Sequence, residues 1–225
     1  MKVFTYYMPT PVWPERNQLD LIDIWKRSWI KRGWEPVVLT EDDAKTHPKF
    51  SYYKEKIWAL PTEYGHDYEG ACFMRWLAVA QAGGGMMTDY DVINYEFLPS
   101  DLPPLDKMFI VADNPPAWIF MGAVAGPQQH FQDMADIFTA WVPDEHDMNT
   151  TSKTYYGMHC SDLSMLKRMF ETKTYPKPDW LTRCPGCSII GDHPGWKTAK
   201  LIHFTANMRE FGHWPKTELE KIRPI

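Results

Sequence analysis

Two aspartates separated by one residue, Asp89 and Asp91, have the types and the spacing to hold a divalent cation. They follow three glycines and a short apolar run over residues 83–88. In an extended chain alternate side chains share a face, so we expect both carboxylates to point one way and Tyr90 the other. Carboxylate oxygens suit Mg²⁺ or Mn²⁺, which usually keep open positions for substrate phosphates. The pair therefore predicts a metal–diphosphate site at the end of a strand.

The segment before the glycines, residues 71–82, is rich in alanine and apolar nearly all round. This pattern predicts a buried helix that the glycine run terminates. Arg75 is its only charged residue, and burying an unpaired charge is costly, so Arg75 needs a partner. It either forms a structural pair with a nearby carboxylate or faces Asp89, Asp91 or a bound phosphate, and these alternatives are compatible.

Residues 71–94 resemble the sugar-binding region of DXD glycosyltransferases with the GT-A fold. That family includes initiating mannosyltransferases, capsule and lipopolysaccharide transferases, and large glucosylating toxins. Its pattern is an Asp, two residues, an Arg, an apolar helix, two glycines, an aromatic residue and Asp-x-Asp. The positions that match are Arg75, Gly83, Gly84, Asp89 and Asp91. The chain departs from the pattern at Cys72, where the family often has an Asp that touches the ribose, and at Met86 or Met87, where a Tyr is common.

The resemblance implies a single GT-A-like domain over residues 1–225. Its fold would be α/β, a three-layer α/β/α sandwich with a mixed, mostly parallel sheet. The implied activity is metal-dependent transfer of a sugar from a nucleotide-diphosphate sugar donor, with Mn²⁺ or Mg²⁺ as cofactor and with retention favoured over inversion. The acceptor stays open among glycans, proteins and small molecules.

The candidate site residues lie at the ends of predicted strands and helices, where open α/β sheets bind their ligands. The resemblance assigns the metal to Asp89, Asp91 and His203, with His213 and Asn207 as the next candidates after His203. It assigns the nucleotide sugar to Thr5, Tyr7, Arg75, Asp89, Tyr90, Asp113 and Asn114. Catalytic roles are assigned to Asp91, Asp89 and Asp162. The small-residue segment 121–130 is expected to border the sugar.

Several of these residues also have a purely structural interpretation. Thr5 fits core packing, and a lone His203 in an apolar strand fits a buried core histidine. Asp113 and Asn114 fit the cap of a turn. Asp162 fits a favourable place at the N-terminus of a helix; alternatively, His159 or Asp162 lines the donor sugar or the acceptor.

Apolar periodicity and turn residues predict alternating strands and helices along the chain. We expect strands over residues 2–8, 35–40, 86–89, 107–112, 118–125 and 199–205. We expect helices from Asn17, as the N-cap, to Gly33, and over residues 52–60, 68–82, 128–141 and 160–170, the last capped by Ser161. The β-α-β start is typical of a three-layer α/β fold.

Length and charge exclude several classes of protein. A chain of 225 residues is long enough for one domain with a sizeable core. The net charge of −5 argues against a nucleic-acid-binding surface. No apolar run approaches membrane-spanning length, and residues 1–5 fit a strand better than a signal peptide. We therefore expect a soluble cytoplasmic enzyme.

Four cysteines in a chain of this length do not form a disulfide scaffold. Cys184 and Cys187 form a CxxC motif in a proline-rich stretch, whereas Cys72 and Cys160 are isolated. The motif fits a plain loop, half of a zinc site or a redox pair.

Two rival functions fit parts of the sequence. A DxD phosphatase requires Thr or Val two residues beyond the second Asp, where Ile93 stands, and a later Gly-Asp followed by another Asp, where Gly191 and Asp192 precede His193. A non-catalytic nucleotide-sugar or glycan-binding module on the same fold is compatible with the departures at Cys72 and Met87.

Overall fold

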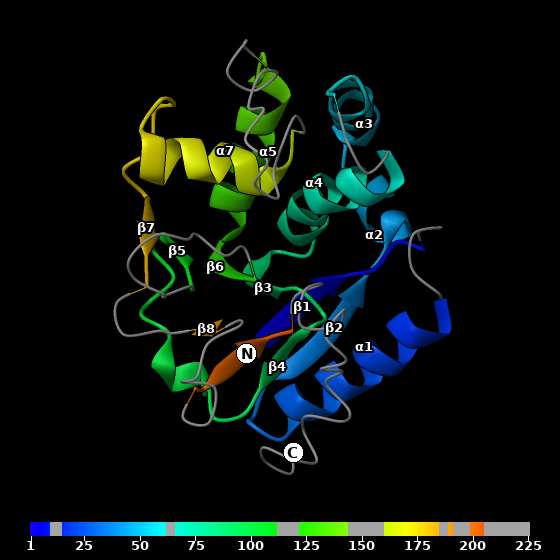
Figure 1. Cartoon of the computed structure of the whole chain (residues 1–225), viewed down its shortest axis with the longest axis vertical. Helices are drawn as coiled ribbons and strands as arrows, with labels where there is room; N and C mark the ends of the chain where they lie inside the picture. The colour runs from blue at the N-terminus through cyan, green and yellow to red at the C-terminus, as the bar shows by residue number, and fades with distance from the viewer. Residues whose placement is uncertain are drawn as a thin grey trace, which may run out of the picture.

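A mixed six-stranded sheet forms the middle of the molecule (Figure 1). The computed structural model describes residues 1–9, 15–61, 66–111, 122–143, 160–184, 189–190 and 199–204. The strand order is β2 (Glu35–Leu39), β1 (Lys2–Tyr6), β3 (Gly84–Thr88), β6 (Ala123–Pro127), β5 (Met108–Ile110) and β7 (Leu181–Arg183). β6 runs antiparallel to both of its neighbours, and the other pairs are parallel. The prediction of a mixed, mostly parallel sheet is confirmed.

A second, smaller sheet lies beside the first and has the order β4 (Val92–Asn94), β9 (Leu201–His203) and β8 (Ile189–Ile190). β4 pairs antiparallel with β9, and β9 pairs parallel with β8. Because β4 follows β3 after a three-residue connection, this sheet places a late segment of the chain next to the predicted metal site.

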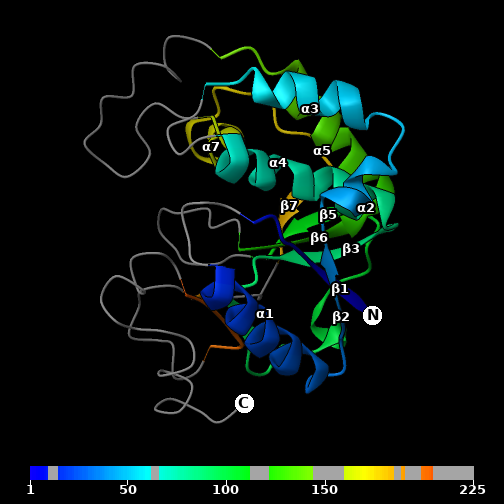
Figure 2. The same ribbon diagram turned by 90° about the vertical axis from the view of Figure 1, so that its right-hand side faces the viewer.

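Helices cover both faces of the large sheet (Figure 2). One side carries α1 (Glu15–Ile30), next to β4 of the small sheet. The other side carries the other α-helices of the described residues: α2 (Glu41–Lys45), α3 (Phe50–Trp58), α4 (His66–Gln81), α5 (Gln128–Ala140) and α7 (Asp162–Lys167), which continues as the π-helical turn η2 (Arg168–Thr172). The three predicted layers are therefore present, but one of them combines a helix with the small sheet.

The pleat of the strands divides the buried side chains between two cores. In β1, Phe4 packs with the helices α4 and α5, whereas Val3 packs with α1 and the small sheet. In β3, Met87 and Met86 alternate in the same way. The core on the α1 side holds Trp25, Trp29 and Trp34, so these aromatic residues serve packing.

The glycine run has the role that the sequence predicts. α4 ends at Gln81, and Gly83, Gly84 and Gly85 all have positive φ, at 98°, 78° and 133°. A β-carbon on Gly84 would lie 2.3 Å from the backbone nitrogen of Gln128. Only glycine can turn the chain here and let β3 begin against the first residue of α5.

Most predicted elements are present with boundaries that shift by a few residues. Ser161 is the N-cap of α7, with its Oγ accepting a hydrogen bond from the Ser164 N–H at 3.2 Å. The prediction of Asn17 as a helix cap is wrong, because α1 already includes Glu15. Residues 118–121 of one predicted strand lie outside the described residues. Elements that were not predicted are α2, β4, β7, β8 and the 3₁₀ turn η1 (Pro99–Asp101).

Candidate metal centre

Asp89, Asp91 and His203 form a compact group of ligand atoms beyond the carboxyl end of β3. One ligand atom from each residue lies within 4.8 Å of the other two. His203 Nε2 lies 3.2 Å from Asp91 Oδ1 and 3.8 Å from Asp89 Oδ2. Two ligands bound to one ion at about 2.1 Å lie at most about 4.2 Å apart. The group therefore needs only small side-chain adjustments to close around a metal ion.

A tight turn, rather than an extended strand, presents the two aspartates. β3 ends at Thr88, and the Val92 N–H donates to the Asp89 carbonyl at 3.0 Å. The Asp89 N–H donates to the Gly122 carbonyl at 3.0 Å, which fixes the turn to the residue before β6. The expected pairing of Asp89 and Asp91 is present, but the prediction that strand alternation produces it is wrong.

His203 reaches the aspartates through the pairing of β4 with β9. Val92 lies opposite His203 in this pair, and the Phe204 N–H donates to the Asp91 carbonyl at 2.9 Å. Gly122 leaves room for the imidazole, since a β-carbon there would lie 3.2 Å from His203 Nδ1. Asp91 and His203, which are 112 residues apart in the sequence, are thus held next to each other by backbone hydrogen bonds.

Helix α1 anchors the backbone of this turn and of β4 from the other side. The indole N–H of Trp25 donates to Thr88 Oγ1 at 2.9 Å, and that of Trp29 donates to the Val92 carbonyl at 3.1 Å. Ser28 Oγ accepts from the Asn94 N–H at 3.1 Å. These hydrogen bonds join residues 63 to 66 positions apart, so no local sequence pattern indicates them.

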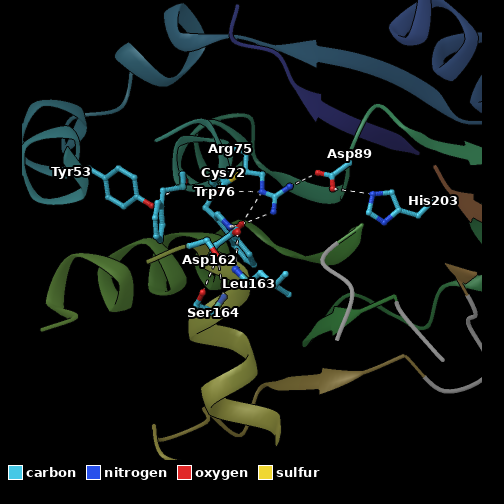
Figure 3. A network of polar contacts seen from close by, with 11 residues as sticks. Tyr53, Cys72, Arg75, Trp76, Asp89, Asp162, Leu163, Ser164 and His203 are labelled. Carbon is cyan, nitrogen blue, oxygen red and sulfur yellow. Dashed lines mark hydrogen bonds and ion pairs between the residues drawn. The ribbon is translucent and has the colours of Figure 1, made fainter. Parts of the chain in front are cut away.

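Arg75 joins the metal-site carboxylate to a second, buried carboxylate (Figure 3). Its Nη1 donates to Asp89 Oδ1, and its Nη2 and Nε donate to Asp162 Oδ2 at 2.6 and 2.9 Å. Nε also donates to the Cys72 carbonyl at 3.0 Å. Both interpretations of Arg75 therefore hold at once: it has a structural partner in Asp162, and it faces the predicted metal site.

The charges of the site perturb one another. Burial raises the pKa of Asp89, Arg75 opposes that rise, and the neighbouring Asp91 adds to it. Asp162 and Asp89 raise the pKa of Arg75 against the burial that would lower it. A bound cation would favour the ionised form of Asp89, as the positive charge of a metal does for any carboxylate ligand.

Two residues of α4 extend the site. Tyr68, Cys72 and Arg75 are spaced at i, i+4 and i+7, which places them along one face of the helix. Burial is the main cause that raises the pKa of the Cys72 thiol. Cys72, burial, and the carboxylates of Asp89 and Asp91 raise the pKa of Tyr68, which is partly exposed. Sequence reasoning missed Tyr68, although its helical spacing from Arg75 could have identified it.

The predicted donor-binding residues of β1 lie at the same sheet edge as the aspartates. β1 and β3 are parallel neighbours with Phe4 opposite Met87, so Thr5 lies near the carboxyl end of β1, beside the end of β3 that leads to Asp89. Thr5 is buried, and among the described residues its hydroxyl makes no hydrogen bond, which is unusual for a buried polar group. Tyr7 is half-buried and donates its N–H to the Leu39 carbonyl at 2.8 Å. Their donor-binding roles stay predictions.

Tyr90 lies in the turn between the aspartates and packs against the core on the α1 side. Its hydroxyl is 3.4 Å from Gln18 Oε1. The remaining candidates, which are Asp113, Asn114, His159, Asn207 and His213, lie outside the described residues.

The cysteines divide into two kinds. Cys72 and Cys160 are free, and Cys184 is disulfide-bonded. Cys187 lies outside the described residues. A disulfide at Cys184 contradicts the zinc interpretation of that residue, because zinc binds thiolates.

Replacing His203 tests the third ligand. We expect His203→Ala to raise the Mn²⁺ concentration needed for half-saturation by at least about tenfold. Replacing even a residue that only hydrogen-bonds a metal ligand weakens metal binding by about that factor. The melting temperature without metal should change little. His130→Ala is the matched control, because His130 stacks on Trp180 at 4.4 Å between ring centroids and belongs to α5, the helix that Figure 2 shows on the opposite face of the sheet from α1. An unshifted Mn²⁺ titration with a large loss of metal-free stability would identify His203 as a core residue.

Residues 2–98 match a protein-family model described as a domain of unknown function, DUF8765. The matched region includes Arg75, Asp89 and Asp91 and ends before Asp162 and His203. No curated protein matches the chain. Within the described ranges, none of the helices is long and apolar enough to cross a membrane.

Proposed function

We propose that this protein is a metal-dependent glycosyltransferase with a GT-A-like fold that uses a nucleotide-diphosphate sugar as donor. The observation that carries the proposal is the group of Asp89, Asp91 and His203 at the carboxyl end of β3, supported by Arg75. Ligands of open α/β sheets bind at that edge, where the strand order leaves a crevice. The mixed sheet and the helices on both faces are compatible with the same fold.

The donor set fits the ion that such a reaction requires. Two carboxylates and one imidazole suit Mn²⁺, and the carboxylates alone suit Mg²⁺. A divalent cation held by these residues would neutralise the charge that develops on the departing diphosphate. Arg75 holds Asp89 from one side, and Asp91 presents its carboxylate next to His203. Thr5 and Tyr7 stand at the neighbouring strand end, where a nucleotide would be bound.

The reaction needs little else from the protein. When the configuration at the anomeric carbon is retained, no dedicated protein base is required. Catalysis then depends on stabilising the departing diphosphate. The resemblance of residues 71–94 favours this course. The acceptor, whether a glycan, a protein or a small molecule, would approach the sugar from the side of the metal open to solvent, since Asp89 keeps 32% of its side-chain surface exposed.

A thermal-shift screen of UDP-, GDP- and other nucleotide sugars, with and without Mn²⁺, tests the proposal. A ligand at a hundred times its Kd stabilises the folded state by about 2.7 kcal/mol, which for a chain of this length is about 5–10 °C. We expect one donor class to give such a shift only with Mn²⁺. Mn²⁺-dependent hydrolysis of that donor would separate an enzyme from a binding module. The absence of a Mn²⁺-dependent shift with every donor would overturn the proposal.

A further inference from the structure

Asp162 is a buried carboxylate whose hydrogen-bonding capacity is used within the protein. It is 1% exposed. Oδ2 accepts from Arg75 Nη2 and Nε, and also from the Trp76 indole N–H at 2.8 Å. Oδ1 accepts from the Leu163 N–H at 2.8 Å. With both oxygens engaged and no solvent access, Asp162 has nothing left to offer a substrate, so its hydrogen-bonded link to the metal site runs through Arg75.

Arg75 links Asp162 to the metal site, because its guanidinium contacts both Asp162 and Asp89. The bonds from Nε and Nη2 to Asp162, with the bond from Nε to the Cys72 carbonyl, fix the plane of the guanidinium. The remaining terminal nitrogen, Nη1, then meets Asp89 Oδ1. The other oxygen of Asp89, Oδ2, is left facing His203 at 3.8 Å. The guanidinium therefore selects which oxygen of Asp89 is available to a cation (Figure 3).

The same contacts determine the net charge around a cation bound at the candidate site. Asp162, Asp89 and Asp91 each carry one negative charge when ionised, and Arg75 carries one positive charge, so the group has a net charge of −2. Without Asp162 the positive charge of Arg75 is only partly compensated, and it lies against a metal-site carboxylate. A positive charge at this position, with only Asp89 left to pair it, repels a metal cation.

We propose that Asp162 is a positioning residue for the cation site: it compensates Arg75 and orients the guanidinium so that Asp89 Oδ2 stays free for the metal. This inference rests on the cation-binding part of the proposed function. It replaces the catalytic role predicted for Asp162 from the sequence. Asp162, the first residue of α7, would instead help to position the residues that bind the ion.

Direct Mn²⁺ binding tests the inference without any assay of turnover. The electron paramagnetic resonance signal of free Mn²⁺ reports how much of the ion the folded protein binds. We expect Asp162→Asn to weaken Mn²⁺ binding by about three- to tenfold, as for loss of one partly screened charge several ångströms away. The double variant Arg75→Met/Asp162→Asn removes the positive charge of Arg75 as well, so it should bind Mn²⁺ more tightly than Asp162→Asn alone.

The matched control is Asp43→Asn. Asp43 also accepts hydrogen bonds near a helix N-terminus, from the N–H and hydroxyl of Thr40 at 2.7 and 3.0 Å, but it belongs to α2 and lies outside the metal group. This variant should lose stability and keep its Mn²⁺ affinity. If Asp162→Asn does not fold, Asp162→Glu replaces it in the test. This variant keeps the charge but moves the carboxylate by one methylene. We expect the displaced guanidinium to weaken Mn²⁺ binding by at least about twofold.

The outcomes separate the two proposals. Wild-type affinity in Asp162→Asn, or in Asp162→Glu where only that variant folds, would overturn the positioning role and leave the cation site standing. A double variant that binds no better than Asp162→Asn would also overturn it, because the effect would then not pass through Arg75. Failure of the wild-type protein to bind Mn²⁺ would overturn both this inference and the cation site.

Discussion

Asp91→Asn should abolish metal-dependent turnover of the donor sugar while leaving the fold intact. The substitution keeps the shape of the side chain and removes the charge that faces His203 and the cation. Loss of the ion removes several kcal/mol of stabilisation of the leaving group, so we expect a loss of activity of at least about 10³-fold. Asp89→Ala should be comparably damaging. The measurement is hydrolysis or transfer of the best donor from the thermal-shift screen across a Mn²⁺ titration.

Stability gives this prediction a second, independent readout. Asp89 and Asp91 are like charges close together, so removing one relieves repulsion when no metal is present. The metal-free melting temperature of Asp91→Asn should therefore equal or slightly exceed that of the wild type, whereas stabilisation by added Mn²⁺ should disappear. Asp136→Asn is the control, since Asp136 is an exposed aspartate paired with Lys49 at 2.8 Å. Near-native Mn²⁺-dependent activity in Asp91→Asn would refute the metal assignment.

Arg75→Lys should lose most of the activity, although it keeps the positive charge. The guanidinium donates from three nitrogens to Asp89, Asp162 and the Cys72 carbonyl, and an ammonium cannot hold all three in that geometry. A displacement of about 1 Å at a catalytic group can cost about 10²-fold, and we expect a loss of that order. Steady-state kinetics at saturating Mn²⁺, with circular dichroism to verify folding, provides the measurement.

Arg75→Met separates the structural role of Arg75 from the functional one. It leaves Asp162 buried without its cation, which we expect to cost about 3–5 kcal/mol of unfolding free energy. Arg168→Met is the matched control at another buried arginine, whose Nε donates to Thr174 Oγ1 just after η2. The control should lose stability and keep its kinetics. Full activity in folded Arg75→Met would show that Arg75 serves the fold alone.

The local parts of the fold could be predicted because their signals lie within a few residues of one another. The three glycines identify the end of α4 and the start of β3, since positive φ and close approach to Gln128 exclude other residues there. Ser161 was identifiable as a cap from its place before a helix-forming segment. Element boundaries were less well predicted, and the short strands β4, β7 and β8 were missed, because two or three residues carry too little periodicity.

The pairing of Asp89 with Asp91 was predicted correctly, but from an incorrect backbone geometry. The spacing of Asp89 and Asp91 indicated that both carboxylates serve one ion, and the structure brings them together. The cause is the turn closed by Val92 and held by Gly122, not the alternation of a strand. Residues 122 and 203 contribute to that turn and its surroundings through pairing between distant segments, which a local pattern cannot display.

Residue types and local patterns identified the side chains that could carry chemistry: the aspartate pair, the lone arginine of an apolar helix and a histidine in an apolar strand. These follow from residue type and from the cost of burying charge, which are local properties. Which of these side chains contact one another depends on how distant segments of the chain pack. The pairing of β4 with β9 brings His203 to the aspartates, and the packing of α7 against α4 gives Arg75 its second carboxylate in Asp162. Such contacts depend on how sheets and helices stack over long separations, and no short segment of the chain encodes them alone.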